Sequence, residues 1–539
     1  MIAKPSVTET NLAGLVLRHT AQRPEHPALV VATEWSDTEV LEETRLTYGE
    51  LGDRIARVRR GLAEAGLQKG DRVVVMFGVR VELYVLVLAL LASGMVAVLI
   101  DSGMGKTGVV QALKMANAKA IVSVDAVLRH RFWVPALWGL KRYSVERSRV
   151  GVRPFSDLEE HEPLEEPAVD CGSQAPALIT FTSGTTGRPK GANRTHDLLI
   201  AQHHALAEHF PASGDEVDMP CFPVVPLHNL CSGISTVLPA VDFGHPASVQ
   251  PGAVLSQIVA EGVTRFAGAP AYLTMIVDHL CASGLKLDEV RTVVCGGAPT
   301  PQALCHKMQR ALPEAEKIII YGSTEAEPIA SVSMEEFAGA EGKGYLVGRV
   351  AEAATVAIVS LPDPVPQLGD DEMEPFAVAS GEVGELVVRG PHVLRGYVDN
   401  PAADRETKIR APDGGVWHRT KDLARIDDEG RIWLVGRTSD AFEIDGRKVY
   451  PFPIEVRVDA LEGVVRSALI ARSSTPCGEL LIVVDEKADA DATIERVRRW
   501  LDDRDLQSVV VDVIPELPVD PRHNSKIDRP ALRATREGK

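Results

Sequence analysis

Hydroxyl side chains, glycines and one lysine are concentrated between residues 182 and 191. An apolar segment, Ala177 to Phe181, leads into the run Thr182-Ser183-Gly184-Thr185-Thr186-Gly187 and then into Arg188-Pro189-Lys190-Gly191. Glycines let backbone N–H groups approach a phosphate closely, hydroxyls donate further hydrogen bonds, and a lysine neutralises negative charge. The pattern predicts a strand that feeds a loop for the phosphates of a triphosphate. A flexible linker has a similar composition, but linkers seldom follow a buried strand so abruptly.

A second stretch, Gly105-Lys106-Thr107, resembles the end of a Walker A motif. Ile100 stands where that motif requires its first glycine, so we interpret these residues as an ordinary loop. The loop at residues 182–191 does not fit the Walker A spacing either. The loop at residues 182–191 therefore predicts a triphosphate site that is not of the Walker A class.

Composition limits the class of protein. A chain of 539 residues is too long for one core, so two or more domains are expected. The net charge of −17 disfavours nucleic acid or an anionic membrane as the main partner and favours a small substrate. The seven cysteines are odd in number and form no CxxC pair, so neither a disulfide framework nor a zinc site is indicated. We expect a reduced, cytoplasmic environment, and the N-terminus has no apolar segment typical of a signal peptide.

One apolar segment, Leu83 to Ile100, is about long enough to cross a bilayer. Ser93-Gly94 interrupts it, and the part that follows is β-branched and ends at Asp101. We therefore predict a buried helix followed by a buried strand, and no integral membrane span.

Alternating helix and strand patterns place these motifs on a sheet. We predict a helix and then a strand within residues 10–32, an exposed acidic insertion at residues 34–43, and a long amphipathic helix through Gly66. The alternation continues and predicts parallel or mixed sheets covered on both faces. Three apolar runs end in polar residues near Thr182, Gly296 and Tyr321, where open α/β sheets bind their ligands.

From about residue 345 the sequence pattern changes and predicts short strands separated by glycine-containing turns. Residues 427–430 predict a hairpin turn, and residues 361–380 a proline-rich acidic loop. Residues 436–440 indicate a boundary, after which about 100 residues have their own strand and helix alternation. We predict an N-terminal domain of residues 1–436 and a small, mobile α+β lid domain of residues 437–539.

Four motifs in one order carry a family resemblance: TSGTTGRPKG, YGSTE, the aspartate in TKDLARIDDEGRIWLVGR, and Lys526 near the C-terminus. The chain resembles, over essentially its whole length, the acyl-adenylate-forming superfamily of acyl-CoA synthetases, peptide-synthetase adenylation domains and firefly luciferase. The resemblance implies an α/β fold: a large multi-sheet N-terminal adenylating domain, with helices packed on mixed sheets, and the C-terminal lid.

The same resemblance implies the site residues. Thr182, Ser183, Gly184, Thr185, Thr186, Gly187 and Lys190 would hold the phosphates of ATP. Thr324 would contact the phosphate of AMP, and Glu325 would bind Mg2+, the implied metal cofactor. Gly296, Gly297, Ala298, Pro299 and Tyr321 would surround the adenine, Gly322 would also bind the nucleotide, and Asp422 would bind the ribose hydroxyls. Lys526 would stabilise charge during adenylation, and Arg437 would mark the hinge of the lid.

Several patches, RHNSKI, YGSTEAEPIA, VDMPCFP and GAPAYL, resemble a narrower branch, the β-lactone synthetases of bacterial olefin biosynthesis. That resemblance implies adenylation of a long-chain β-hydroxy fatty acid, followed by attack of its own hydroxyl to give a β-lactone and AMP. His228 could be the base for the second step, or could shape the acyl pocket. The alternatives are a long-chain acyl-CoA synthetase and an acyl-AMP ligase that loads a carrier protein. The branch implies olefin-pathway partners with thiolase-like, reductase and lactone-decarboxylating activities.

Overall fold

The computed structural model describes residues 10–147, 149–182, 189–245, 248–340, 343–362, 365, 373–411, 413–472, 478–519 and 526–537, without the side chains of residues 102 and 537. The chain forms two compact units. Unit 1 contains the described residues of Met1–Ala267, Thr324–Glu327 and Gly390–Lys408, and unit 2 those of Gly268–Ser323, Pro328–Arg389 and Ile409–Lys539. Unit 2 includes residues on both sides of position 436, so the predicted domain boundary there stays a prediction.

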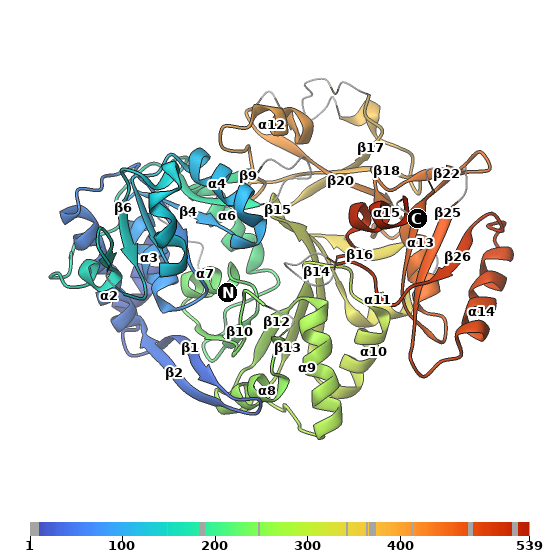
Figure 1. Ribbon diagram of the computed structural model, residues 1–539, viewed down its shortest axis with the longest axis horizontal. Helices are drawn as coiled ribbons and strands as arrows, with labels where there is room; N and C mark the ends of the chain where they lie inside the picture. Colours follow the sequence, from blue (N-terminus) through green and yellow to red (C-terminus); the bar gives the residue numbers. More distant parts are fainter. Residues whose placement is uncertain are drawn as a thin grey trace. The chain divides into compact units, whose positions relative to one another are not determined.

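A seven-stranded sheet forms one half of unit 1 (Figure 1), in the strand order β7-β6-β5-β3-β4-β8-β9. The strands are β3 (Arg72–Met76), β4 (Val96–Ile100), β5 (Ala120–Ser123), β6 (Lys141–Ser144), β7 (Arg153–Pro154), β8 (Pro176–Thr182) and β9 (Lys190–Thr195). All neighbours are parallel except β8 and β9. Alternate residues of β3 belong to different cores, one containing α3 (Val81–Ala92) and the other α4 (Gly105–Ala116). The sheet is therefore covered on both faces, as predicted.

The apolar segment from Leu83 to Ile100, which is about long enough to cross a bilayer, forms helix α3 and strand β4. Every residue of α3 except Glu82 is buried, and its 12 residues span only about 18 Å, whereas a bilayer core is about 30 Å thick. Within the described residues, no helix has the length and apolar character that crossing a membrane requires. The predicted helix followed by a strand is confirmed.

Five further strands belong to unit 1, in the order β2-β1-β11-β10-β12. They are β1 (Pro27–Trp35), β2 (Val40–Thr47), β10 (Val217–Pro220), β11 (Ser235–Leu238) and β12 (Arg265–Gly268). The exposure predicted for residues 34–43 is confirmed, because their acidic side chains are exposed or half-buried, but the prediction missed that β1 and β2 pair there as an antiparallel hairpin. Helix α2 (Tyr48–Glu64) begins after a capping box of Thr47 and Glu50. It buries Ile55, Val58 and Leu62, which the helical spacing predicts, and also Leu51, whereas Ala65 of the same predicted series follows the helix and is half-buried.

The remaining helical segments of unit 1 are α1 (Ala13–Gln22), η1 (Ser102–Met104), α5 (Asp125–Leu128), η2 (Arg129–Phe132), η3 (Pro135–Leu137), η4 (Phe155–Leu158), α6 (His196–Leu206), α7 (Val225–Ser232), α8 (Pro251–Ala260) and α12 (Pro401–Thr407). Gly105-Lys106-Thr107 is the first turn of α4 and not the loop that we predicted. Gly105 has a φ of +70°, which lets the chain turn directly from η1 into the helix.

Unit 2 contains the strand run β17-β18-β20-β21-β16-β15-β14-β13. The strands are β13 (Thr292–Gly296), β14 (Glu316–Ser323), β15 (Ala326–Ser333), β16 (Tyr345–Val350), β17 (Thr355–Val359), β18 (Gly384–Arg389), β20 (Val416–Ile426) and β21 (Ile432–Arg437), with β19 (Lys408–Arg410) beside β20. Its helices here are α9 (Pro270–Ser283), α10 (Gln302–Ala311), α11 (Met334–Gly339) and η6 (Glu374–Phe376). Much of the loop predicted at residues 361–380 lies outside the described residues.

The predicted lid region forms a three-stranded sheet, β24 (Val464–Ala471), β25 (Gly478–Val484) and β26 (Val510–Val513), and a small hairpin, β22 (Phe442–Ile444) and β23 (Arg447–Val449). Helices α13 (Pro451–Asp459), α14 (Ala490–Asp502) and α15 (Arg529–Glu537) accompany them. The sequence alternation predicts strands at residues 465–471, 480–484 and 508–514 and a helix at 492–504; all four are confirmed with their ends within two residues, whereas α13 and α15 were missed. Together the two units are the mixed α/β fold with several sheets that we predicted.

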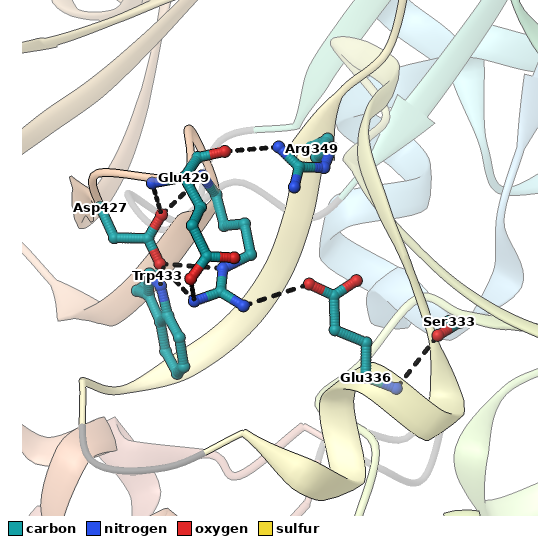
Figure 2. A network of polar contacts seen from close by, with 7 residues as sticks. Ser333, Glu336, Arg349, Asp427, Glu429 and Trp433 are labelled. Carbon is teal, nitrogen blue, oxygen red and sulfur yellow. Dashed lines mark hydrogen bonds and ion pairs between the residues drawn. The ribbon is translucent and has the colours of Figure 1, made fainter.

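The hairpin predicted at residues 427–430 joins β20 and β21 and is held by one buried carboxylate (Figure 2). Asp427 accepts hydrogen bonds from the backbone of Glu429 at 3.0 Å and of Arg431 at 2.9 Å, and from Trp433 Nε1 at 2.8 Å. The Arg431 guanidinium also contacts Asp427 at 2.9 Å. Arg431 Nη1 also donates to Glu336 Oε1 of α11 at 3.3 Å, and Glu336 and Asp427 are both labelled in Figure 2. The carboxylate therefore fixes the turn and its contact with α11.

Replacing Asp427 by Asn will weaken this hairpin by about 2 kcal/mol at neutral pH. Burial alone would raise the pKa of Asp427, but the hydrogen bonds from Trp433 and Arg431 outweigh burial and lower it to about 2. A carboxyl with a lowered folded-state pKa stabilises fully above its ordinary value of 3.8 and loses that contribution as the pH falls through about 2. Hydrogen exchange of the β20 and β21 amides measures the loss. The exposed neighbour Asp428→Asn is the control, and equal protection in both variants would contradict the prediction.

Candidate functional site

The predicted phosphate loop is anchored at both ends in unit 1. Thr182, the last residue of β8, pairs with Lys190, the first residue of β9. Ser183, Gly184, Thr185, Thr186 and Gly187 lie outside the described residues. The antiparallel pairing places Thr182 and Lys190 opposite each other, so the loop starts and ends at the carboxyl end of a parallel sheet.

Arg194 of β9 connects Thr324, from the YGSTE motif, to strand β8, which leads into this loop. Its guanidinium donates to Thr180 Oγ1 at 2.5 Å and to the carbonyl oxygen of Thr324 at 2.9 Å. Arg194 is buried, which makes both bonds difficult to replace with water. The structure therefore brings the predicted phosphate ligands Thr182, Lys190 and Thr324 to one place.

Glu325 follows Thr324 and is held by the segment after β18. Leu394 N donates to the Glu325 carbonyl oxygen at 2.7 Å, and the Tyr397 hydroxyl donates to Glu325 Oε1 at 2.6 Å. Tyr397 is itself paired with Ala192 of β9. The carboxylate of Glu325 is thus fixed beside the strand that starts at Lys190.

Two lysines flank the same tyrosine. Lys190 Nζ lies 5.7 Å and Lys408 Nζ 5.6 Å from the centroid of the Tyr397 ring. Burial lowers the pKa of Lys408 to about 7, although Glu325 and Asp404 act in the opposite direction. Burial and the Glu325 carboxylate also raise the pKa of Tyr397, so its hydroxyl stays protonated and donates. This cluster combines the carboxylates of Glu325 and Asp404 with two amines, and groups of both signs suit a metal ion and phosphate groups together.

Sequence reasoning missed Tyr397 and Lys408. Lys408 follows the short helix α12 and begins a three-residue strand, so no periodic pattern marks its burial. Tyr397 is an ordinary buried aromatic by composition. Only the pairing of its segment with β9 shows that its hydroxyl faces Glu325.

A second group of predicted residues lies in unit 2. The Tyr321 hydroxyl donates to Asp422 Oδ2 at 2.6 Å, and Arg437 Nη1 lies 3.4 Å from Asp422 Oδ1. Arg437 also donates to the Thr420 carbonyl oxygen at 3.1 Å. Burial and the nearby Asp422 carboxylate raise the pKa of Tyr321, so this hydroxyl also remains a donor. Strand pairing between β20 and β21 sets Asp422 directly opposite Arg437.

The glycine turn after β13 belongs to the same unit. Strands β13 and β14 are parallel neighbours, so the turn at Gly297, Ala298 and Pro299 leaves the sheet at the same edge as Tyr321 and Gly322. Gly297 has a φ of +80°, which favours glycine, and Thr300 N beyond the turn donates to the Tyr345 hydroxyl at 2.5 Å. The residues predicted to surround a purine thus come from two adjacent strand ends.

His228 lies in the buried part of α7, which ends at Ser232 before Gly233. Its Nε2 is 3.2 Å from the Phe210 carbonyl oxygen, which can only accept, so Nε2 carries the proton in the neutral ring. Its Nδ1 is 3.0 Å from Nδ1 of His203. Burial lowers the pKa of His228 to about 4, so the ring is neutral at physiological pH. Both ring nitrogens are engaged, and the role of His228 as a base stays a prediction.

Lys526 is exposed and precedes α15, whose first residue anchors this end of the chain. Arg529 is 6% exposed and donates to both carboxylate oxygens of Glu455, at 2.7 and 2.6 Å, and to the Leu469 carbonyl oxygen at 2.8 Å. It also lies 3.4 Å from Asp440, next to the predicted hinge. A buried ion network therefore connects the lysine segment to α13, β24 and the hinge.

Replacing Arg529 by Met will destabilise this region by about 3–5 kcal/mol, because Glu455 is left buried without its cation. Hydrogen exchange of α13 and α15 measures the loss, and the rate of adenylation should fall with it. Arg499→Met is the matched control, since its ion pair with Glu495 is exposed and contributes little. A double variant with Glu455→Leu should recover much of the stability; no recovery would contradict the pairing.

Comparison with known proteins agrees with these motifs. The family model described as AMP-binding enzyme matches residues 16–398. The chain is 32% identical to the olefin beta-lactone synthetase of Stenotrophomonas maltophilia, with 91% of each chain covered, and 29% identical to that of Xanthomonas campestris, with 97% of each covered. A feruloyl-CoA synthase of an Amycolatopsis species is 30% identical, over 83% of this chain and 84% of that protein.

Solved structures show the same fold. The amide bond synthetase McbA from Marinactinospora thermotolerans has a TM-score of 0.79 at 22% identity and covers 97% of this chain. The anthranilate CoA ligase AuaEII, in complex with anthranoyl-AMP, has a TM-score of 0.79 at 19% identity and covers 99%. The family model matches most of this chain, and the strand ends carry the family's motif residues. The chain therefore belongs to the AMP-binding enzymes, the acyl-adenylate-forming superfamily, and is an AMP-forming, acid-activating ligase that uses ATP.

Proposed function

We propose that this enzyme activates a long-chain β-hydroxy fatty acid as its acyl-AMP and then closes it to a β-lactone. The observation that carries the proposal is the similarity to two olefin beta-lactone synthetases over more than nine-tenths of each chain. Both half-reactions need a carbonyl with a good leaving group, and the second uses a nucleophile within the same molecule. The enzyme would act in the cytoplasm, beside the other enzymes of an olefin pathway.

In the first step a carboxylate oxygen of the acid attacks the α-phosphorus of ATP, and pyrophosphate leaves. Lys190, Thr182, Ser183, Thr185, Thr186 and the backbone of Gly184 and Gly187 would bind the phosphates, and Thr324 the phosphate that remains in AMP. Gly296, Gly297, Ala298, Pro299 and Tyr321 would surround the adenine, and Gly322 would also bind the nucleotide. The Asp422 carboxylate would bind the ribose, with Arg437 at the hinge, and Lys526 would stabilise charge on the reacting oxygens.

The residues around Glu325 fit Mg2+. This ion binds through one or two carboxylates together with phosphate oxygens, and Glu325 supplies one carboxylate beside the phosphate-binding strand ends. Within the described residues no cluster of three or more His, Cys, Asp or Glu side chains could hold a metal by itself. Bound Mg2+ would neutralise negative charge on the phosphates, while Tyr397 keeps the Glu325 carboxylate in place.

In the second step the β-hydroxyl oxygen attacks the acyl carbonyl carbon, and the bond from that carbon to the AMP oxygen breaks. A base takes the hydroxyl proton, and AMP leaves with the electron pair. His228 is our candidate among the predicted residues, because its neutral ring can accept a proton at Nδ1 once the contact with His203 opens.

The test supplies purified enzyme with ATP, Mg2+ and a long-chain β-hydroxy acid in the absence of CoA. A β-lactone product with stoichiometric AMP supports the proposal. Strict dependence on CoA with a thioester product would overturn it in favour of an acyl-CoA synthetase, an alternative that the similarity to a feruloyl-CoA synthase favours. Transfer only to a carrier protein would indicate the third function, an acyl-AMP ligase.

A further inference from the structure

One segment of unit 1 has a net charge opposite in sign to that of the whole chain. Residues 129–153 contain seven Arg and Lys residues and a single acidic residue, Glu146, a net charge of +6 in a protein whose total is −17. We call the described residues of this segment, 129–147 and 149–153, the basic aromatic patch. Its charge is opposite to that of the molecule as a whole, so it can approach an anionic surface that the rest of the chain repels.

The patch also exposes large apolar side chains. Phe132 is 63%, Trp133 74%, Trp138 61% and Val150 88% exposed. The other large hydrophobic side chains exposed in the described part of the chain are aliphatic and lie elsewhere: Leu41, Val259, Leu285, Val465, Val510 and Val513. Clustered exposed aromatic residues are uncommon on a protein that has no partner for them, and they indicate an interaction site.

Side-chain to backbone hydrogen bonds hold these residues together as one surface. Arg131 donates to the Val150 carbonyl oxygen at 2.9 Å, and Trp138 Nε1 donates to the Arg131 carbonyl oxygen at 2.9 Å. The Arg131 guanidinium lies 4.2 Å from the Phe132 ring centroid, and the Phe132 and Trp133 rings meet edge to face with centroids 6.0 Å apart. The apolar residues of η2, of the segment after η3 and of the turn at 150 are therefore contiguous.

The cationic part of the patch borders a hollow of about 550 Å³. Arg129, Arg147 and Arg149 line it, together with Asp125 and Glu146. Arg149 is paired with Asp125 at 2.6 Å, whereas the exposed Lys141 and Arg147 add charge close by. Basic side chains beside exposed tryptophans match the two layers of a lipid interface, anionic headgroups above and acyl chains below.

We propose that the basic aromatic patch docks this enzyme on the surface of an anionic lipid bilayer, with Phe132, Trp133, Trp138 and Val150 inserted among the lipids. Nucleic acid is the other polyanion that basic and aromatic residues can bind, by stacking bases on ring faces. Here Arg131 already covers a face of Phe132, and Val150 at the tip offers a base nothing to stack on. The geometry therefore favours lipid.

Docking at this place leaves the chemistry undisturbed. Strand β6 is separated from β8, which carries the phosphate loop, by β5, β3 and β4, a distance of about 19 Å at the usual strand spacing. A membrane-bound enzyme can receive long-chain acids and release apolar products without passing them through water. The docking itself does not depend on whether the product is a lactone.

The test is co-sedimentation of the full-length enzyme with vesicles of phosphatidylcholine alone or of phosphatidylcholine mixed with phosphatidylglycerol. We expect binding to the mixed vesicles at low salt, a blue shift of tryptophan emission on binding, and release at high salt. Lys141→Gln with Arg147→Gln should weaken binding about 30-fold, at about 1 kcal/mol for each charge. Phe132→Ser with Trp133→Ser should weaken it at least about tenfold and reduce the emission shift.

Matched variants outside the patch control for charge and apolarity. Lys286→Gln with Lys487→Gln removes two exposed cations and Leu41→Ser with Val259→Ser two exposed apolar side chains elsewhere, and both variants should bind as the unaltered enzyme does. All variants should keep the same melting temperature and the same adenylation rate with a short, soluble acid. Failure to sediment with anionic vesicles would overturn the proposal. So would equal losses in patch and control variants, or patch-dependent binding only to a single-stranded oligonucleotide or to a second copy of the chain.

Discussion

Replacing Lys526 by Ala will abolish acyl-adenylate formation, by about 10³-fold or more, and leave ATP binding nearly unchanged. The lysine is proposed to act on charge that develops as the carboxylate attacks the α-phosphorus. Losing an interaction made mainly in the transition state lowers the rate far more than it lowers affinity for the ground state. Pyrophosphate release measures the rate, and equilibrium titration with ATP in the absence of the acid measures binding.

A second lysine of the same region separates this effect from a general loss of charge. Lys487 is also exposed and lies, like Lys526, within residues 437–539. The Lys487→Ala variant should therefore catalyse adenylation at the normal rate. Retained pyrophosphate release in the Lys526 variant would remove Lys526 from the mechanism. A parallel loss of ATP binding would instead indicate that it holds the nucleotide in the ground state.

The fold could be predicted where a local pattern decides the structure. The helical spacing of Ile55, Val58 and Leu62 and the capping residues Thr47 and Glu50 specify α2 without help from the rest of the chain. The β-branched run after Gly94 likewise specifies β4. The hairpin between β1 and β2 could not be found in this way, because its second strand is rich in acidic residues, which are uncommon in strands.

Some residues of the candidate site could likewise be predicted from local motifs, and others could not. Motif residues such as Lys190, Thr324 and Glu325 could be named from sequence because their types and order are specific to a family. Tyr397 and Lys408 could not, because a tyrosine and a lysine become a hydrogen-bond donor and a buried cation only through the pairing of residues 396–398 with β9. The surface patch was hidden for a different reason: a net charge of −17 averages over a local charge of the opposite sign.

Replacing Glu325 by Gln will reduce adenylation by about 10²-fold or more and raise the concentration of Mg2+ needed for the remaining activity. Gln has the same shape, and its amide oxygen can still accept the 2.6 Å hydrogen bond from Tyr397, so the local structure should persist. What is lost is the negative charge that Glu325 places beside Lys408. Initial rates across a range of Mg2+ concentrations measure the effect.

Tyr397→Phe tests the support that the tyrosine gives to this carboxylate. It keeps every charge and removes the hydroxyl that donates to Glu325, so we expect a smaller loss, about tenfold, with a nearly normal requirement for Mg2+. Glu335→Gln, an exposed carboxylate in α11, should have no effect. If Glu325→Gln left the Mg2+ dependence unchanged while slowing the reaction, the carboxylate would act by balancing the buried charge of Lys408, because a metal ligand cannot lose its charge without weakening the metal.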